Sequence, residues 1–355
     1  MRNKLAFGAK VIVLLATLLF LSALTLAQQA PDSSNYTPTG KLLDIGGYKL
    51  HINCTGVGNP AVIFISGAGD FSFDWSLIQP SISRFTQGCS YDRAGQAWSQ
   101  LGPVPRTMRQ EAYELHLLLS KARIKPPFIL VGHSIGGLIS RVYAQQYPRE
   151  VAGMVLVDPT HEDTTLMYQG KIVRVRDSAK GRPVPPVQTM KSSPPKPPTG
   201  DDIKQQEFNR QVFGPPKIEP PFDKLPADIQ RVRLWALSNP KLFAATEDYW
   251  AEELQKMYME SSRGEFPLGN RPLVVLIQSG KESNTPPQGI SIEEWNRISN
   301  EKRKQKLGLT RLSHNSKVII AEESGHHIQL DAPEIVINAI REVVDAVRKG
   351  RRLSQ

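Results

Sequence analysis

The sequence predicts an α/β protein in which helices flank a mostly parallel central sheet. Short apolar runs alternate with amphipathic stretches, and most of these runs are continuous, as is typical of strands buried on both faces. The chain has 355 residues, 40% hydrophobic and 22% charged, which excludes a disordered chain, a coiled coil and a polytopic membrane protein. The predicted strands cover residues 48–54, 61–66, 88–91, 128–132, 153–158, 273–278 and 317–321.

The N-terminal segment predicts export. Three basic residues precede an uncharged apolar run over residues 11–26, and the small residue Ala27 follows it. This order is typical of a signal peptide over residues 1–27, here followed by a polar leader over residues 28–40. An uncleaved membrane anchor is the alternative, because the run is long for a signal core. In both cases we expect the body of the chain to lie outside the cytoplasm, in the periplasm or secreted.

The charge pattern argues against nucleic acid as a partner. Lys+Arg 44 against Asp+Glu 34 gives a net charge of +10, but no run of five like charges is present. The surplus predicts a basic surface that can contact a membrane or an anionic envelope peripherally. Gly67 and Gly69 begin a dinucleotide-binding pattern, but Ser72 replaces its third glycine. Since no phosphate loop or zinc signature is present either, we expect no cofactor and no metal.

The two cysteines, Cys54 and Cys89, are predicted to form a disulfide. An exported chain folds in an oxidising compartment, where two thiols without CxxC spacing are more often bridged than metal-bound.

Two helices are predicted beside the sheet. Thr107 and Gln110 form a capping pattern before apolar residues that recur at helical spacing as far as Ala122. Asp331 and Glu334 repeat the capping pattern before an apolar stripe over residues 336–347. The alternation of strands and helices is that of an α/β fold.

An insertion interrupts this alternation. Residues 164–269 contain no convincing strand, and residues 183–226 are crowded with prolines. Aromatic and apolar residues at helical spacing over 225–261 predict a helical cap behind a partly extended proline-rich arm. The predicted domains are a core over residues 41–163 and 270–349, a cap over residues 164–269, and a basic tail over residues 350–355.

The strongest local signal is the segment Gly132-His133-Ser134-Ile135-Gly136. It follows an apolar run and precedes a helical pattern, so it matches a G-x-S-x-G turn between a strand and a helix. Glycines leave room for the tight backbone crossing, and the serine hydroxyl is exposed at the turn. Ser134 is therefore the candidate nucleophile.

A serine hydroxyl needs a base to remove its proton, and His326 is the candidate. It lies between the last predicted strand and the last predicted helix, which brings it to the carboxyl edge of the sheet where Ser134 also lies. The neighbouring His327 is the alternative base or a lining residue. The remaining histidines in strands, helices and the elbow, including His133, are explained by packing.

These motifs resemble the α/β-hydrolase family over about residues 41–349. The elbow, the late histidine and the cap insertion follow the family's chain order, and the segments Asp74-Trp75-Ser76-Leu77 and Tyr91-Asp92-Arg93-Ala94-Gly95 are typical of it. The resemblance is greatest to its esterase, lipase and aminopeptidase-like branches. Dehalogenases and epoxide hydrolases of this fold carry an aspartate at the elbow, and Ser134 argues against both.

The resemblance leaves the acid open between several carboxylates. Most members place it after the strand that corresponds to residues 273–278, where Glu282 is the only candidate and no aspartate is present. Some lipase-like members place it one strand earlier, where Asp158 ends the strand. We favour Asp158, with Glu282 as the alternative acid and Glu162 or Asp163 as further candidates.

Two backbone N–H groups are expected to hold the developing oxyanion. The first is that of Ile135, next to the nucleophile, and the second is that of Ala68 in the loop after the strand at residues 61–66. Ser66 stands where the family usually has a histidine, which we expect to change the support of the loop and to leave the hole intact.

The predicted function is that of an exported serine hydrolase that cleaves the carboxylic esters of a small acyl substrate through an acyl-enzyme. One alternative is an amide hydrolase similar to proline iminopeptidases, in which Glu247, Glu252 or Glu253 would hold a substrate amine. Another is a non-catalytic binding protein, because one fold serves many functions.

Overall fold

The structure, a computed structural model, describes residues 36–168, 171–187, 199–244, 250–261, 267–279, 286 and 289–354. It divides into two units, residues 1–37 and 38–355, and the second is described below. The predicted signal peptide and most of the polar leader lie outside the described residues. Within the described part, no helix has the length and apolar character needed to cross a membrane.

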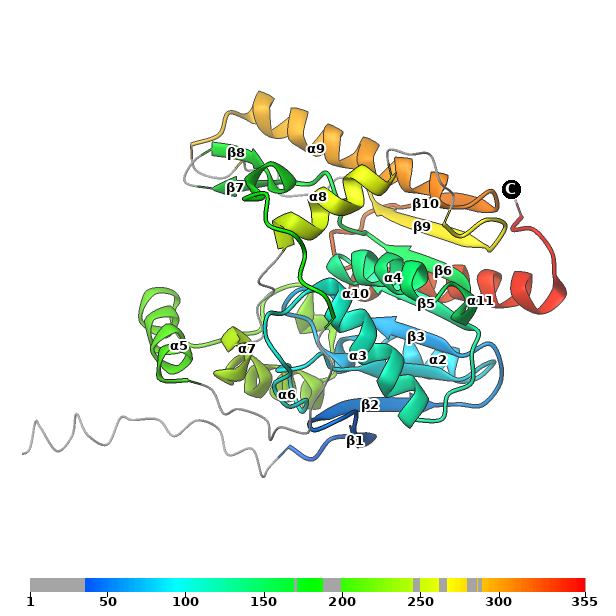
Figure 1. Ribbon diagram of the computed structural model, residues 1–355, viewed down its shortest axis with the longest axis horizontal. Helices are drawn as coiled ribbons and strands as arrows, with labels where there is room; N and C mark the ends of the chain where they lie inside the picture. The colour runs from blue at the N-terminus through cyan, green and yellow to red at the C-terminus, as the bar shows by residue number, and fades with distance from the viewer. Residues whose placement is uncertain are drawn as a thin grey trace, which may run out of the picture. The chain divides into compact units, whose positions relative to one another are not determined.

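The described residues form a central sheet with strand order β1-β2-β4-β3-β5-β6-β9-β10. The pairs β1–β2 and β2–β4 are antiparallel and the other neighbours are parallel, so the predicted mostly parallel sheet is confirmed (Figure 1). The strands are β1 (Lys41–Asp44), β2 (Lys49–Thr55), β3 (Val62–Ile65), β4 (Gly88–Tyr91), β5 (Phe128–His133), β6 (Val151–Val157), β9 (Leu273–Gln278) and β10 (Ser316–Ala321).

Each predicted strand is present, with bounds that differ by no more than two residues. Strands β3, β5 and β9 are buried along their whole length, which is why their sequences are continuous apolar runs. The edge strand β1 was not predicted. It is short and mostly exposed, and it begins with Lys41 and ends with Asp44, so its hydrophobic pattern is weak.

Helices cover both faces of the sheet. On one face α3 (Met108–Lys121), α4 (Ile135–Gln146) and α8 (Trp250–Ser261) pack in one apolar cluster, and on the other α2 (Gln79–Ile82) and α11 (Pro333–Lys349) pack in a second. The predicted cap of α3 is confirmed, because the Thr107 side chain accepts a hydrogen bond from the Gln110 N–H. The layers therefore place the carboxyl ends of β5 and β6 at one open edge.

The predicted cap of the last helix is wrong. Asp331 ends a separate short helix, α10 (Ile328–Asp331), and Ala332 precedes α11 without a side-chain cap. Pro333 at the first position of α11 has no N–H that needs a partner. The Asp331 carboxylate instead accepts a hydrogen bond from the Gly325 N–H at 2.9 Å, next to His326.

The insertion departs from the prediction in two places. A hairpin, β7 (Thr165–Tyr168) and β8 (Lys171–Arg174), lies where no strand was expected. Within the proline-rich arm, α5 (Gly200–Phe213) forms between prolines because Thr199 and Asp202 make a capping box. The helical half is confirmed by α6 (Ala227–Leu237), α7 (Lys241–Ala244) and α8. The division into core, cap and basic tail stays a prediction.

Two further features bear on the site. Cys54 and Cys89 face each other across β2 and β4 and are joined by a disulfide, with 4.1 Å between their Cα atoms. Helix α9 (Ile292–Gly308), capped by Ser291, was not predicted and packs beside β9. Short 3-10 helices complete the described elements: η2 (Ser72–Trp75), η3 (Pro148–Glu150), η4 (Val175–Ser178), η5 (Phe222–Lys224) and η6 (Leu309–Leu312).

Candidate active site

Ser134 lies at a strained turn between β5 and α4. Its backbone has φ 52° and ψ −121°, outside the regions that side chains usually allow. A Cβ at Gly136 would lie 2.1 Å from the carbonyl oxygen of Ile65, and one at Gly132 would lie 2.4 Å from that of Gly136. The glycines are therefore needed for the backbone to cross this closely, as the G-x-S-x-G pattern predicts.

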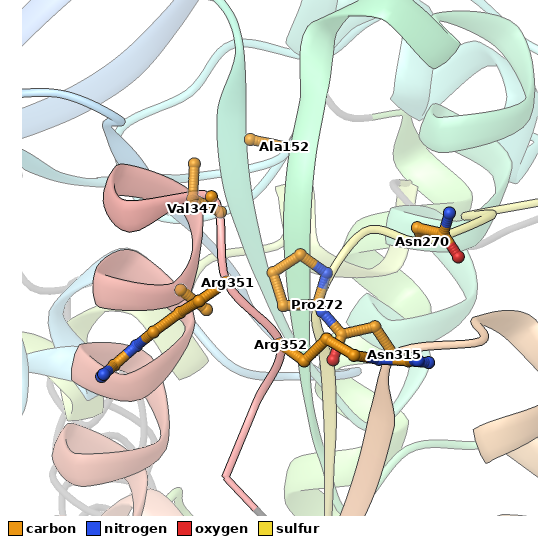
Figure 2. A pocket seen from close by; sticks show the side chains of 9 residues that line it. Ala152, Asn270, Pro272, Asn315, Val347, Arg351 and Arg352 are labelled. Atoms are coloured by element: carbon orange, nitrogen blue, oxygen red, sulfur yellow. The ribbon is translucent and has the colours of Figure 1, made fainter.

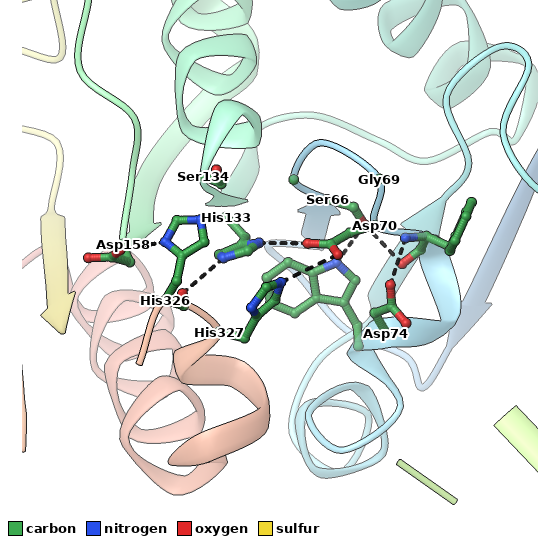
Figure 3. Close-up of polar contacts among 12 residues, drawn as sticks. Ser66, Gly69, Asp70, Asp74, His133, Ser134, Asp158, His326 and His327 are labelled. Atoms are coloured by element: carbon green, nitrogen blue, oxygen red, sulfur yellow. Dashed lines mark hydrogen bonds and ion pairs between the residues drawn. The ribbon is translucent and has the colours of Figure 1, made fainter. Parts of the chain in front are cut away.

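His326 and Asp158 are in contact. The Nδ1 atom of His326 lies 2.6 Å from Oδ2 of Asp158, although the two residues are 168 positions apart. Asp158 directly follows β6 and its side chain is fully buried, whereas the His326 side chain is 41% exposed. In Figure 3 the imidazole lies below Ser134, and its ring centroid is 4.7 Å from that of His133, the residue before Ser134. The three candidate residues thus gather at the carboxyl edge of the sheet.

Asp158 is held as an anion. Burial alone raises the pKa of this carboxyl, but the hydrogen bond from His326 and the charge of Lys306 outweigh it and lower the pKa to about 2. The Lys306 Nζ atom lies 2.7 Å from Oδ2, and the N–H of Gln278 donates to Oδ1 at 3.2 Å. A carboxylate in this state can orient the imidazole and stabilise an imidazolium.

The other candidate acids are placed differently. Glu162 receives two hydrogen bonds from Arg141, at 2.6 and 3.1 Å. Asp163 pairs with Arg176 at 2.5 Å and with Arg174. Glu282 lies outside the described residues.

His133 links the candidate base to the loop after β3. Its Nε2 faces the backbone carbonyl of His326 at 3.0 Å, and its Nδ1 faces Oδ2 of Asp70 at 2.9 Å. Burial lowers the pKa of His133 to about 4, so its ring is neutral near pH 7 and donates to one of these two acceptors. Packing alone was predicted for His133, and the structure assigns it this polar bridge as well. Its position beside the nucleophile is the only feature of the sequence from which a second role could have been predicted.

His327 turns away from Asp158. Its Nε2 lies 3.5 Å from Oδ1 of Asp70, and its ring meets that of Phe222 edge to face. The ligand atoms of Asp70, His133 and His327 lie within 4.8 Å of one another, which is a spacing that a metal ion could use. However, Arg233 lies 3.5 Å from Asp70, and its guanidinium would repel a metal cation bound there. We therefore interpret the group as a hydrogen-bonded cluster.

Polar side chains support the loop after β3 through hydrogen bonds. Arg93 donates to the carbonyl oxygens of Ser66 and Gly67, at 2.5 and 3.0 Å. The Ser66 hydroxyl donates to the carbonyl of Phe71 and accepts from the indole N–H of Trp75, both at 3.0 Å. Ser66 thus supports the loop in place of the family's usual histidine.

One expected oxyanion donor comes from the loop after β3 and the other from the start of α4. Ala68 is exposed at the tip of the loop, and Gly69 takes the left-handed φ of 69° that lets the loop turn there. Ile135 is the first residue of α4, where a backbone N–H has no partner within the helix. Both N–H groups are thus compatible with an external acceptor.

Arg233 connects α6 to the same loop, and the sequence analysis missed it. Its guanidinium pairs with Asp74 and donates to the carbonyl of Gly69 at 3.3 Å. It stacks 3.4 Å over the ring of Phe222, and its side chain is 7% exposed. The contact joins the helical half of the insertion to the candidate site.

A separate cavity lies at the opposite edge of the sheet. It has a volume of about 440 Å³ and is lined by Ala152, Pro272 and Asn315 at the amino ends of β6, β9 and β10 (Figure 2). Arg351 and Arg352 complete its rim. Because Ser134 and His326 lie at the carboxyl edge, this cavity is not part of the candidate site.

Comparisons with known proteins identify the family to which the chain is similar. A model of the alpha/beta hydrolase family matches residues 62–339. An AB hydrolase superfamily protein of Gibberella zeae is 28% identical over 306 residues, which cover 81% of this chain and 87% of that protein. A protein of Hormonema carpetanum named "Probable transporter efuK" is 25% identical over 92% of this chain, and the match spans only 45% of its own length.

Solved structures show the same fold. A thermophilic esterase from Thermogutta terrifontis aligns with a TM-score of 0.56 and 20% identity, over 84% of this chain and 94% of that one. The epoxide hydrolase CorEH aligns with a TM-score of 0.56 and 14% identity, over 88% of this chain and 99% of that one. With the family match over most of its length and with this fold, the chain belongs to the alpha/beta hydrolase family.

Proposed function

We propose that this protein is a serine hydrolase that cleaves carboxylic esters through an acyl-enzyme intermediate. The observation that carries the proposal is the 2.6 Å contact between His326 Nδ1 and Asp158 Oδ2 beside the elbow that holds Ser134. A nucleophile, a base and an orienting acid in this chain order are the parts that acyl transfer needs.

In the first half of the reaction, the Ser134 hydroxyl attacks the ester carbonyl carbon while Nε2 of His326 takes its proton. Asp158 stabilises the imidazolium, and the N–H groups of Ala68 and Ile135 donate to the oxyanion. The tetrahedral intermediate then breaks its bond to the alcohol, which leaves with the proton from His326. In the second half, a water molecule gives its proton to His326 and attacks the acyl carbon, which releases the carboxylic acid and restores Ser134.

Ester cleavage is favoured over the reactions of related branches. Epoxide hydrolases appear among the proteins of similar fold, but family members with that activity carry an aspartate at the elbow, where this chain has Ser134. The esterase from Thermogutta terrifontis shares the fold. A serine at this turn is suited to acyl transfer.

The amide-cleaving alternative finds little support in the described acids. Glu252 is held by two hydrogen bonds from Arg182, at 2.9 and 2.7 Å. Glu253 accepts from the backbone N–H groups of Met108 and Arg109 at the start of α3. Both carboxylates are buried and occupied, so neither is poised to hold a substrate amine. Glu247 lies outside the described residues.

Labelling with a fluorophosphonate probe separates this proposal from a non-catalytic binding protein. We expect one probe per chain on the wild type and none on Ser134→Ala, because the probe reacts only with an activated serine. Ser120→Ala, on the exposed side of α3, is the matched control and should label fully. Hydrolysis of a short acyl ester should follow the same pattern. Equal labelling of Ser134→Ala and the wild type would reject Ser134 as the nucleophile.

We also propose that the protein works outside the cytoplasm, with residues 1–27 as its signal peptide or anchor. The disulfide between Cys54 and Cys89 supports this, since such bridges persist in oxidising compartments. Fractionation of the native host, followed by mass measurement of the N-terminus, tests both the compartment and the cleavage. The net charge of +10 suggests peripheral contact with anionic surfaces, which salt-sensitive binding to anionic vesicles would reveal.

A further inference from the structure

The candidate acid has a second partner besides His326, the lysine Lys306. Lys306 lies in the last turn of α9, and its Nζ is 2.7 Å from Oδ2 of Asp158. The Lys306 side chain is only 12% exposed and that of Asp158 is fully buried. The ion pair offsets part of the cost of taking the ammonium group out of water.

Lys306 and His326 contact the same carboxylate oxygen. His326 Nδ1 lies 2.6 Å from Oδ2, and the other oxygen, Oδ1, accepts the backbone N–H of Gln278. The charge that orients and stabilises an imidazolium is therefore shared with a permanent cation. A lysine that shares a carboxylate oxygen with His326 opposes its protonation, because like charges repel strongly in a poorly solvated site.

The other ionisable groups around His326 lie on elements other than α9, the helix that carries Lys306. The ring of His133 lies 4.7 Å from that of His326, and the ring of His327 lies 5.4 Å from it. Asp70 faces both of these histidines from the loop after β3. A substitution at Lys306 therefore changes the charge beside Asp158 and removes none of these other groups.

We propose that Lys306 is a positioning residue that sets the pH range in which His326 acts as the base, because it shares Asp158 with the imidazole. The proposal rests on the proposed function in assigning His326 as the base. Without the lysine charge, His326 binds its proton more tightly, so the base becomes available only at higher pH. Loss of one charge that shares this carboxylate oxygen should move the titration of His326 by about one pH unit.

The test compares Lys306→Met with the wild type in kcat/KM for a short acyl ester between pH 5 and pH 9. We expect the acid limb of Lys306→Met to move up by about one pH unit while the plateau at high pH stays within a few fold. Lys306→Arg keeps the charge and should restore the wild-type limb. Lys304→Met removes an exposed lysine from the same helix and should leave the limb unchanged.

Two results would overturn the proposal. An acid limb of Lys306→Met at the wild-type pH, with or without a lower plateau, would mean that the lysine has only a structural role. An equal shift in Lys304→Met would mean that the effect comes from net charge. If Lys306→Met does not fold by near-UV circular dichroism, Lys306→Gln, which is also uncharged, takes its place in the same comparison.

A direct titration separates this proposal from the proposed function. The ring nitrogens of His326 can be followed by NMR in the intact protein, with His326→Gln used to assign the signal. The His326 titration should move up by about one pH unit in Lys306→Met whether or not the protein hydrolyses esters. Absence of a shift rejects the coupling of Lys306 to His326, whereas a shift in a protein that no fluorophosphonate labels rejects only the proposed function.

Discussion

Replacing Asp158 by asparagine tests the assignment of the acid most directly. Asparagine keeps the size of the side chain and an oxygen that can accept the Gln278 N–H, but it loses the charge that faces His326 and Lys306. We expect turnover of a short acyl ester to fall on the order of 10⁴-fold, the loss seen when a triad aspartate is neutralised in another serine hydrolase. This corresponds to about 5 kcal/mol of transition-state stabilisation.

The same substitution should lower stability by an amount that the structure allows to be calculated. The pKa of Asp158 is lowered from 3.8 to about 2, which corresponds to about 2 kcal/mol of folding free energy at neutral pH. Because the folded-state pKa is depressed, this contribution is full above about pH 4, falls to about half at pH 3 and disappears as pH falls through about 2. Asp158→Asn also leaves the buried Lys306 without its partner, so 2 kcal/mol is a lower limit at pH 7.

Two assays measure these effects. Ester hydrolysis at fixed pH is compared among Asp158→Asn, Glu282→Gln and Asp163→Asn, with near-UV circular dichroism to check folding. Urea unfolding of the wild type and Asp158→Asn is compared at pH 7 and pH 3, where the difference in unfolding free energy should shrink. An inactive Glu282→Gln beside an Asp158→Asn of near wild-type activity would refute the reasoning and move the acid to the position that most relatives use.

Three further substitutions test the elbow and the disulfide. Ser134→Ala should lose nearly all hydrolysis of a short acyl ester with no fall in Tm, and more than about a hundredth of wild-type activity would place the nucleophile elsewhere. Gly136→Ala puts a Cβ 2.1 Å from the Ile65 carbonyl oxygen, so we expect a large loss of Tm and activity. Gly308→Ala is the control, because Gly308 has open space around it, and it should have the wild-type Tm. Equal Tm values for the two variants would contradict the close contact between Gly136 and Ile65. Replacing Cys54 and Cys89 by serine should lower the free energy of unfolding in urea by about 3 to 4 kcal/mol, since the bridge closes a loop of 35 residues. Two titratable thiols in protein from its native host, denatured without a reductant, would show that no bridge forms.

Local features of the sequence determined the sheet and the elbow. Strands β3, β5 and β9 are recognisable because burial on both faces leaves a continuous apolar run. The elbow is recognisable because its G-x-S-x-G spacing is local, although the close contact of Gly136 is with Ile65 at the end of β3. Helix α9 gave no comparable signal. Eight of its 17 residues are charged and Ile298 is its one buried residue in the described structure, so its apolar periodicity is weak.

Only the tertiary structure decided which side chains meet. The sequence left the acid open among Asp158, Glu282, Glu162 and Asp163, because each lies near the end of a strand and the choice depends on a contact across 168 residues. Lys306, from the helix that was not predicted, reaches the same carboxylate, and Asp70 reaches His133 across 63 residues. Spacing along the chain reports which backbone conformation a segment can adopt, whereas an ion pair depends on how separate elements are packed, and no local pattern records that distance.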